Sequence, residues 1–193
     1  IEDAFEHVGS TGRDALHTRL RIVNKEGEDV VRGESGELLL QGPNVLREYW
    51  GDQTATGEAF HEGWFRTGDM GYQDDDGYVY INDRKTDVVI SGGENIYPAE
   101  LEQILDTVEG LAEATVVGIP DLRWGEVPAA LVVLEPGKTF DKQAILSCFE
   151  DRLARFKHPK VVIQMDALPR NVMGKVLKHE LRAKFADGTL APS

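Results

Sequence analysis

Cysteine is almost missing from this sequence, with Cys148 the only one among 193 residues. A single thiol excludes an internal disulfide and a cysteine-rich zinc site, and it favours a reducing compartment, so we expect a cytoplasmic protein. Basic residues are also in deficit, with 21 Lys and Arg against 34 Asp and Glu. Because phosphates need basic surface, this balance disfavours nucleic acid as a partner. No apolar run approaches the roughly 18 residues of a membrane helix, so we expect no integral membrane contact.

Several catalytic signatures are missing as well. No Gly-x-Ser-x-Gly elbow and no Gly-x-Gly-x-x-Gly loop occurs, and Gly174-Lys175 lacks the flanking residues that a phosphate loop needs. The histidines show no spacing typical of metal ligands, so no metal site is predicted in the residues of the chain itself. The five histidines are His7, His17, His61, His158 and His179.

Short strand-like runs separated by turns fill the first part of the sequence. Residues 18–23, 36–40 and 77–81 are apolar or β-branched runs, and clusters of Gly, Pro, Asn and Asp bound them. This pattern predicts a small antiparallel sheet or barrel. The acidic run at 74–76 is interpreted as a solvated hairpin turn, with a cation site as the alternative.

Strands and helices interleave after about residue 86. Strands are expected at 87–91, 115–119, 129–134 and 161–165. A helix from Pro98 to about Gly110 should present the apolar stripe Leu101, Ile104, Leu105 and Val108. A second helix, capped by Asp141, should present Ile145, Phe149 and Leu153, and a last one should carry Leu177, Leu181 and Phe185. The pattern predicts a compact α+β domain with its boundary near residue 86.

Basic residues gather towards the carboxy terminus. Residues 151–184 carry nine Lys and Arg and three Asp and Glu, in a protein whose net charge is -13. Such a stretch indicates either a local anion site or a solvated helix face.

Three segments carry candidate chemistry. Residues 63–69 place Asp69 after a glycine turn, where its carboxylate can accept hydrogen bonds from a ribose diol. Residues 83–98 contain Gly92 and Gly93, which leave room for a backbone or a slender ligand to approach. Residues 168–175 end in Lys175 on a loop loosened by Gly174, which could swing towards a phosphate. Taken alone, each segment is more typical of an ordinary turn.

Together, in this order, the three segments resemble the adenylate-forming enzymes, which include acyl-CoA synthetases, peptide-synthetase adenylation domains and firefly-type luciferases. Further matches lie at residues 9–13, 33–38, 42–45, 49–50, 124–128 and 156–160, so the likeness covers nearly the whole chain. Residues 92–98 are similar to the acyl-CoA synthetase branch.

The resemblance implies how the chain is organised. The family's phosphate loop and most of its acyl pocket would precede Ile1, so this chain would be the carboxy-terminal portion of a longer synthetase, inactive alone. The implied fold is α+β. Residues 1–83 would end the large adenylation domain as a small distorted antiparallel β-barrel, 84–86 would be the hinge, and 87–193 the small mobile domain. The family hinge is commonly Asp or Lys, but here it is Thr86, which still permits rotation.

The resemblance also implies a two-step reaction. A carboxylate attacks the α-phosphate of Mg-ATP to give an acyl-adenylate, and coenzyme A then displaces AMP after the small domain rotates. Asp69 would hold the ribose hydroxyls, Arg84 would contact the ribose and phosphate region, and Ile81 would pack near the nucleotide. Lys175 would be catalytic, because a fixed cation at the α-phosphate offsets transition-state charge and contributes about 3–4 kcal/mol.

The second step would use other residues. Gly92 and Gly93 would line the tunnel for the pantetheine arm of coenzyme A. The coenzyme A nucleotide would meet Trp124, Phe156, Lys157 and Lys160. Some relatives carry a basic residue at the position of His158, whose neutral imidazole would contribute less.

The implied partners are ATP with Mg²⁺, coenzyme A and a small carboxylic acid, which could be a fatty acid or another aliphatic, aromatic or dicarboxylic acid. Two alternatives are another adenylating branch, luciferase-like or carrier-protein-loading, and a stand-alone nucleotide-binding module. Residues 169–175 also fit the Pro, four residues, Gly-Lys pattern that acetyltransferases modify in related bacterial synthetases. We therefore expect a protein acetyltransferase to act on Lys175.

Overall fold

The chain divides between Thr86 and Asp87 into two compact units. The computed structural model describes residues 6–191, and each unit is described by itself. The amino-terminal unit ends at Thr86, and the carboxy-terminal unit begins at Asp87.

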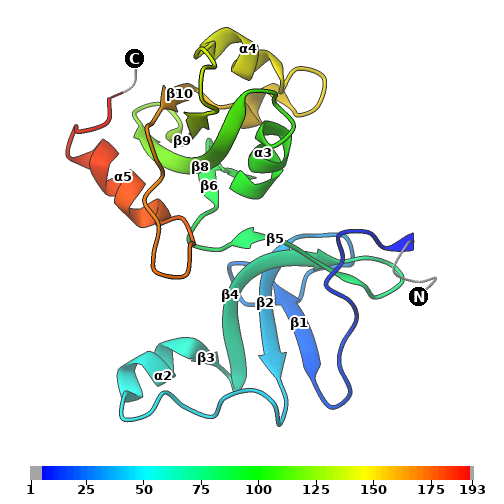
Figure 1. The fold of residues 1–193 in the computed structure, drawn as a ribbon. Helices are drawn as coiled ribbons and strands as arrows, with labels where there is room; N and C mark the ends of the chain where they lie inside the picture. Colours follow the sequence, from blue (N-terminus) through cyan, green and yellow to red (C-terminus); the bar gives the residue numbers. More distant parts are fainter. Residues whose placement is uncertain (1–5, 192–193) are drawn as a thin grey trace. The chain divides into compact units, whose positions relative to one another are not determined.

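The amino-terminal unit is built on one curled antiparallel sheet of five strands (Figure 1). The strand order is β1-β2-β4-β3, and β5 also pairs with β4. Irregularities in the β2–β4 and β4–β5 ladders bend the sheet, because a bulge increases the local twist. The elements are β1 (Arg19–Val23), β2 (Gly36–Gln41), α2 (Gln53–Ala59), β3 (Phe60–His61), β4 (Trp64–Gln73) and β5 (Val79–Arg84). The predicted antiparallel sheet is confirmed, as a curled half-barrel.

Three elements of this unit, α2, β3 and β4, escaped prediction. Residues 64–69, expected as part of a turn, lie inside β4, where Gly68 adopts a φ of 72° and the strand continues into Asp69. Helix α2 begins where the Asp52 side chain accepts a hydrogen bond from Ala55 N at 2.9 Å. This helix buries none of its residues, so no apolar stripe marked it in the sequence.

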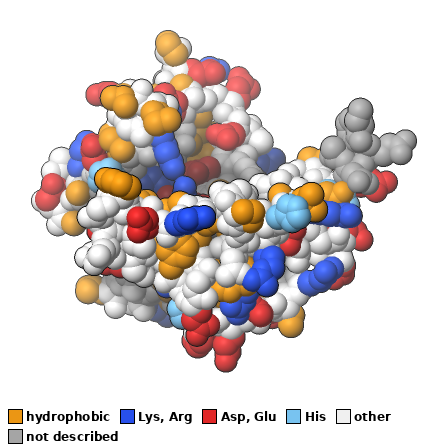
Figure 2. Space-filling view, turned by 90° about the horizontal axis from the view of Figure 1, so that it is seen from below, with side chains coloured by type: hydrophobic (Ala, Val, Ile, Leu, Met, Phe, Trp, Pro, Cys, Tyr) orange, Lys and Arg blue, Asp and Glu red, His pale blue; other side chains and the backbone are white. Residues whose placement is uncertain are grey.

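The apolar core of the amino-terminal unit is small. Ile22, Leu38 and Val79 form its buried cluster, with Leu20 and Val30 packed against them. Other large apolar side chains lie exposed, and Figure 2 shows apolar side chains mixed with charged ones on the face it presents. The most exposed of them in this unit are Val8, Leu16, Val31 and Trp50.

The carboxy-terminal unit has helices on both faces of a five-stranded sheet (Figure 1). The strand order is β10-β9-β6-β7, and β8 also pairs with β9. Strand β10 runs parallel to β9, and the other pairs are antiparallel. The elements are β6 (Val89–Ser91), β7 (Glu94–Ile96), α3 (Pro98–Leu105), β8 (Leu111–Asp121), β9 (Gly125–Leu134), α4 (Lys142–Ser147), the 3₁₀ turn η1 (Arg155–Lys157), β10 (Val161–Gln164) and α5 (Lys178–Ala186).

Neighbouring side chains of β8 and β9 alternate between two apolar clusters, as the two-residue period of a strand requires. Val116 and Val132 belong to the cluster that contains residues of α3 and α4. Val117 and Leu131 belong to the cluster that contains Leu181 of α5. Both faces of the sheet are therefore buried, and the predicted α+β class is confirmed.

Two predicted helices are shorter than expected. Helix α3 ends at Leu105, so Val108 of the expected stripe lies beyond it, and Gly110 follows a turn rather than a helix. Helix α4 begins as predicted at its Asp141 cap but ends at Ser147. Phe149 therefore lies outside α4, yet it is fully buried because the following turns keep it in the first cluster.

The paired glycines form a hairpin, which adds a strand that the sequence analysis missed. Gly92 and Gly93 have φ of 61° and 92° and connect β6 to β7, where Ser91 pairs with Glu94. A two-residue turn with positive φ at both positions favours glycine, and its twist matches the flanking strands. Across residues 6–191, no helix has the length and apolar character to cross a bilayer.

Candidate functional site

Asp69 and Arg84 face each other across the β4–β5 ladder of the amino-terminal unit. Arg84 Nε lies 3.1 Å from Asp69 Oδ1, and Arg84 Nη1 donates a hydrogen bond to the carbonyl of Thr67 at 3.0 Å. The backbone N–H of Asp69 donates to Thr67 Oγ1 at 3.0 Å. These bonds fix the carboxylate and the guanidinium side by side and leave acceptor sites on Asp69 for a hydroxyl-bearing ligand.

A cavity of about 210 Å³ opens beside this pair. Asp69 and Ile81 both line this cavity, so the structure brings two of the three predicted nucleotide-binding residues to the same place. Its other walls include Leu20, Leu40 and Val79. Arg13 and Asp14 add charge to this lining. Apolar side chains and a carboxylate in one cavity suit a flat ring whose attached sugar presents hydroxyl groups.

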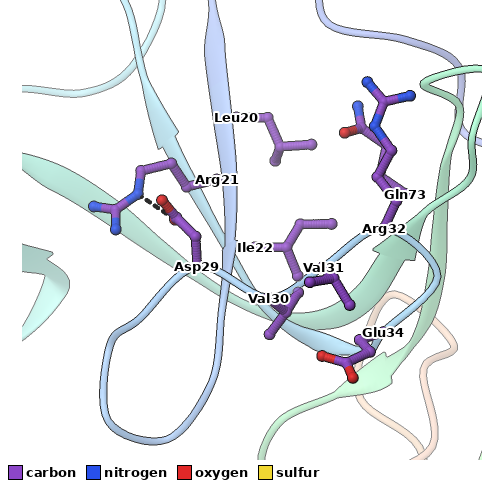
Figure 3. Close-up of a pocket in the computed structure, with 9 residues that line it drawn as sticks. All are labelled: Leu20, Arg21, Ile22, Asp29, Val30, Val31, Arg32, Glu34 and Gln73. Atoms are coloured by element: carbon purple, nitrogen blue, oxygen red, sulfur yellow. Dashed lines mark hydrogen bonds and ion pairs between the residues drawn. The ribbon is translucent and has the colours of Figure 1, made fainter.

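A second cavity in this unit, of about 190 Å³, contains none of the predicted residues (Figure 3). Leu20, Ile22 and Val30 line it. Its Asp29 is already paired with Arg21, whose Nε lies 2.6 Å from Oδ1. Because Arg21 and Asp29 neutralise each other, neither offers an unpaired charge to a ligand in this cavity.

Lys175 lies on an exposed loop of the carboxy-terminal unit. Asn171 organises this loop, because its side-chain oxygen accepts hydrogen bonds from the backbone N–H groups of Met173 and Lys175 at 3.0 and 2.9 Å. Gly174 completes the turn with a φ of 82°. Asn and Gly thus give the loop a defined backbone while the Lys175 side chain stays exposed.

Trp124 lies against Gly92 at the β6–β7 hairpin. Gly92 N donates a hydrogen bond to the carbonyl of Trp124 at 2.8 Å. A Cβ at position 92 would lie only 2.8 Å from Trp124 Cε3, so a side chain there would displace the indole. Trp124 is 45% exposed, and the guanidinium of Arg123 lies 4.7 Å from its ring centroid. The glycine therefore creates an exposed aromatic face beside a cation.

The other predicted coenzyme A residues lie around η1. Phe156 is exposed, and Lys160 lines a cavity of about 560 Å³ together with Arg155 and His158. His158 Nε2 donates to the carbonyl of Leu153 at 2.9 Å, so that ring nitrogen is occupied.

Lys157 has a partner that the sequence analysis missed. Its Nζ donates to both carboxylate oxygens of Glu100 on α3, at 2.6 and 3.0 Å. Glu100 therefore offsets part of the positive charge expected at this position. Charge counting along the sequence overlooked the pair because the two residues are far apart in the chain.

The sequence analysis also missed a buried carboxylate, Glu37. Arg66 Nη2 and Lys85 Nζ lie 2.7 and 2.8 Å from Glu37 Oε2. Burial opposes the charge on Glu37, but hydrogen bonds from Arg66 and Lys85 outweigh it and lower its pKa. The hydrogen bond between Arg66 and Glu37 also raises the pKa of Arg66. The position of Glu37 in the apolar run of β2 could have indicated a buried acid, and a buried acid needs cationic partners.

Two weaker candidates have ordinary structural roles. The acidic run follows β4 as a turn, in which Asp74 accepts from Tyr78 N at 2.7 Å and binds His7 at 3.1 Å. Cys148 is half-buried and donates from Sγ to Ile145 O at 2.9 Å, and burial raises its pKa, which disfavours the reactive thiolate. Among the described residues, no group of three or more His, Cys, Asp or Glu side chains is arranged to hold a metal ion.

Known proteins resemble this chain over most of its length. Residues 100–175 match the family model of the AMP-binding enzyme C-terminal domain. The chain is 49% identical over 187 residues to an indoleacetate–CoA ligase of Aromatoleum aromaticum, covering 97% of this chain and 37% of that protein. It is 45% identical over 185 residues to the long-chain-fatty-acid–CoA ligase FadD13 of Mycobacterium tuberculosis, covering 96% and 36%.

A solved structure gives the same result. O-succinylbenzoate coenzyme A synthetase of Bacillus subtilis, in complex with ATP and a magnesium ion, matches with a TM-score of 0.85 and 38% identity, over 93% of this chain and 37% of that one. The chain thus spans little more than a third of the length of the relatives it matches. Over nearly its whole length the chain is similar to a carboxy-terminal portion of adenylate-forming enzymes.

Proposed function

We propose that this chain is the carboxy-terminal part of an AMP-forming acyl-CoA synthetase, an acid–thiol ligase. The observation that carries the proposal is the Asp69–Arg84 pair at the edge of an apolar cavity. The named relatives are CoA ligases, and each aligns with nearly the whole of this chain. In this view residues 1–83 end the large adenylation domain, 84–86 form the hinge with Thr86 as its pivot, and 87–193 are the mobile domain.

The first half-reaction would use ATP. Asp69 accepts hydrogen bonds from the ribose hydroxyls, Arg84 holds Asp69 and reaches the phosphate side, and Ile81 packs against the nucleotide. Lys175 stabilises charge on the α-phosphate as the carboxylate attacks and pyrophosphate leaves. Because the described residues offer no acidic cluster for a cation, Mg²⁺ would arrive with the ATP phosphates.

The second half-reaction would use coenzyme A, whose thiol attacks the acyl carbon and releases AMP. Gly92 and Gly93 leave the space for the pantetheine arm, and the exposed indole of Trp124 suits adenine. Phe156 and Lys160 extend this surface. Lys157 is a weaker phosphate ligand than its charge suggests, because Glu100 holds its ammonium group.

The test of this function uses the full-length protein with ATP, Mg²⁺, coenzyme A and a panel of fatty, aromatic and dicarboxylic acids. A CoA ligase releases AMP and pyrophosphate and forms a thioester. Adenylate formation that never consumes coenzyme A would favour a luciferase-like or carrier-protein-loading enzyme. Nucleotide binding with no adenylate for any acid would favour a binding module. This chain alone should turn over none of the acids, and turnover by it would contradict the proposal.

The coenzyme A surface has its own test. Gly92→Ala should raise the KM for coenzyme A and leave acyl-adenylate formation intact, because the new methyl group displaces Trp124. Gly137→Ala is the matched control: Gly137 also has a positive φ, 82°, but a Cβ there meets nothing within 4 Å. Equal effects of the two variants on the KM for coenzyme A would reject this assignment.

The acid and the compartment are proposed more broadly. The relatives named above are ligases of indoleacetate, long-chain fatty acids and succinylbenzoate, so a fatty acid is one candidate among several. The lone, half-buried Cys148 supports a reducing compartment, and we place the protein in the cytoplasm.

Lys175 is also proposed as a site of regulatory acetylation, because loss of its charge would remove the contact with the α-phosphate. It is exposed, whereas the Lys178 ammonium group is held 2.9 Å from Glu102. Incubation with a protein acetyltransferase and acetyl-CoA should therefore modify Lys175 well before Lys178, as mapped by mass spectrometry. Equal modification of Lys175, Lys178 and Lys184 would argue against a dedicated switch.

A further inference from the structure

Thr86 lies between two residues that ion pairs hold, each within its own unit. Lys85, directly before it, donates from Nζ to Glu37 Oε2 at 2.8 Å in the amino-terminal unit. Asp87, directly after it, accepts a hydrogen bond from Arg182 on α5 of the carboxy-terminal unit. Thr86 itself is exposed. The chain is therefore anchored one residue before and one residue after the junction of the units.

The first anchor is built around a buried charge. The Glu37 side chain is 7% exposed, and Arg66 holds it in addition to Lys85. Lys85 is also fixed through its backbone, because its N–H donates to the carbonyl of Gly68 at 2.8 Å. Gly68 directly precedes Asp69. The residue before the junction is thus tied to strand β4, which carries the candidate ribose ligand Asp69.

The second anchor belongs to a well-packed helix. Asp87 and Arg182 are both largely buried, with side-chain exposures of 17% and 30%. Arg182 follows Leu181, which is fully buried in the second apolar cluster. One turn earlier on α5, Lys178 Nζ lies 2.9 Å from Glu102 of α3. Movement of Asp87 relative to its unit would therefore require an ion pair to break.

We propose that Glu37 and Arg182 are positioning residues that confine rotation between the units to the φ and ψ angles of Thr86. This inference rests on the proposed function, in which the units change orientation between the half-reactions. With Lys85 and Asp87 fixed, one residue absorbs the rotation, and each orientation is reached along a short, reproducible path. Without the anchors the flexible segment would lengthen, and ordering it in each half-reaction would cost conformational entropy.

The charges beside the junction also explain how threonine can serve as its pivot. Thr86 carries no charge of its own, and its neighbours on each side hold the chain instead. Its short side chain is exposed, so a change in its φ and ψ angles would disturb no buried packing.

The test measures backbone order parameters of residues 83–89 by ¹⁵N relaxation in the 193-residue chain. In the wild type we expect values near 0.85 at Lys85 and Asp87 and below about 0.6 at Thr86. Lys85→Met should lower the order parameter at position 85 but not at 87, and Arg182→Met should do the reverse. Lys85→Arg and Arg182→Lys should restore the wild-type profile, because each keeps the charge.

Two matched controls break ion pairs elsewhere in each unit. Arg21→Met removes the pair with Asp29, and Lys138→Met removes the pair with Glu109. Both should leave the profile of residues 83–89 unchanged. If Glu37→Gln unfolds the amino-terminal unit, Lys85→Met still decides the question, because the Glu37–Arg66 pair survives it.

Low order parameters throughout 83–89 in the wild type would overturn the proposal, as would unchanged profiles in Lys85→Met and Arg182→Met. The readout does not depend on catalysis. A wild-type profile with one mobile residue, in a full-length protein that forms no thioester, would reject the proposed function and retain the anchors. Low order parameters throughout 83–89, in a full-length protein that does form the thioester, would reject the anchors and retain the proposed function.

Discussion

The two units reach their folds by different means. The carboxy-terminal unit buries both faces of its sheet, and Phe149, Leu101 and Leu181 are fully inaccessible. The amino-terminal unit has one small cluster around Leu38, and charged partners surround its buried Glu37. One unit depends on apolar packing and the other to a greater degree on ion pairs and hydrogen bonds. Charged groups are not confined to that unit at the candidate ligand surfaces: the amino-terminal unit carries the Asp69–Arg84 pair, and the carboxy-terminal unit carries the Lys157–Glu100 pair.

The largest effect should follow removal of a core side chain from the carboxy-terminal unit. Phe149→Ala should lower the free energy of unfolding of that unit by about 3–5 kcal/mol, because it leaves a cavity in a closely packed core. Urea titrations followed by amide signals from each unit would measure this. Trp50→Ala, at a side chain that is 96% exposed in the other unit, is the control and should change stability by less than about 0.5 kcal/mol. Similar losses in both variants would refute the contrast between the cores.

A smaller effect is expected at the buried charge of the amino-terminal unit. Glu37→Gln should lower the free energy of unfolding of that unit by about 1–3 kcal/mol, since Arg66 and Lys85 lose the anion they share. The carboxy-terminal unit should be unaffected in the same urea titration. A loss shared equally by both units would show that Glu37 does not act locally.

The same residue predicts a dependence on pH. The pKa of Glu37 in the folded state lies below its ordinary value of 4.5. Its ionised form therefore contributes stability above that value, and the contribution is lost as the pH falls through the lowered pKa. Stability of the amino-terminal unit should fall more steeply below about pH 4.5 in the wild type than in Glu37→Gln. Parallel acid titrations of the two proteins would contradict this.

The smallest effect compares two helix caps. Asp141→Ala should cost the carboxy-terminal unit about 1 kcal/mol, because α4 holds the buried Ile145 in the core. Asp52→Ala removes the corresponding cap of α2, which buries no residue. It should fray α2 with little effect on the unfolding of its unit. Hydrogen exchange at the two helix starts would measure the difference, and equal global losses would contradict it.

The sequence predicted best where a local pattern has one physical solution. The Asp141 cap and Pro98 at the first position of α3 were confirmed. So were the strands expected near 18–23, 36–40, 77–81, 115–119, 129–134 and 161–165. The hairpin at Gly92 and Gly93 was missed because paired glycines fit several turns, and only the pairing of β6 with β7 distinguishes them. Helix ends were wrong where an apolar stripe continued into turns, as it does at Phe149.

The candidate site divides in the same way. Only the combined resemblance of several segments to a known family singled out Asp69 and Lys175, and their roles stay predictions. The partners of charged residues were not predictable, because Lys157 meets Glu100 and Lys85 meets Glu37 only through the fold. Glu100 offsets the positive charge of Lys157. Glu37 holds Lys85 beside the junction between the units.

The central claim is that the two half-reactions use different surfaces of this chain. Its most direct test is Lys175→Ala in the full-length protein, with the exposed Lys138→Ala as control, assayed separately for each half-reaction. Acyl-adenylate formation should fall about 10²- to 10³-fold, because one contact that stabilises transition-state charge is lost. Thioester formation from supplied acyl-adenylate and coenzyme A should stay at the level of the control. Equal losses in the two half-reactions would contradict the account.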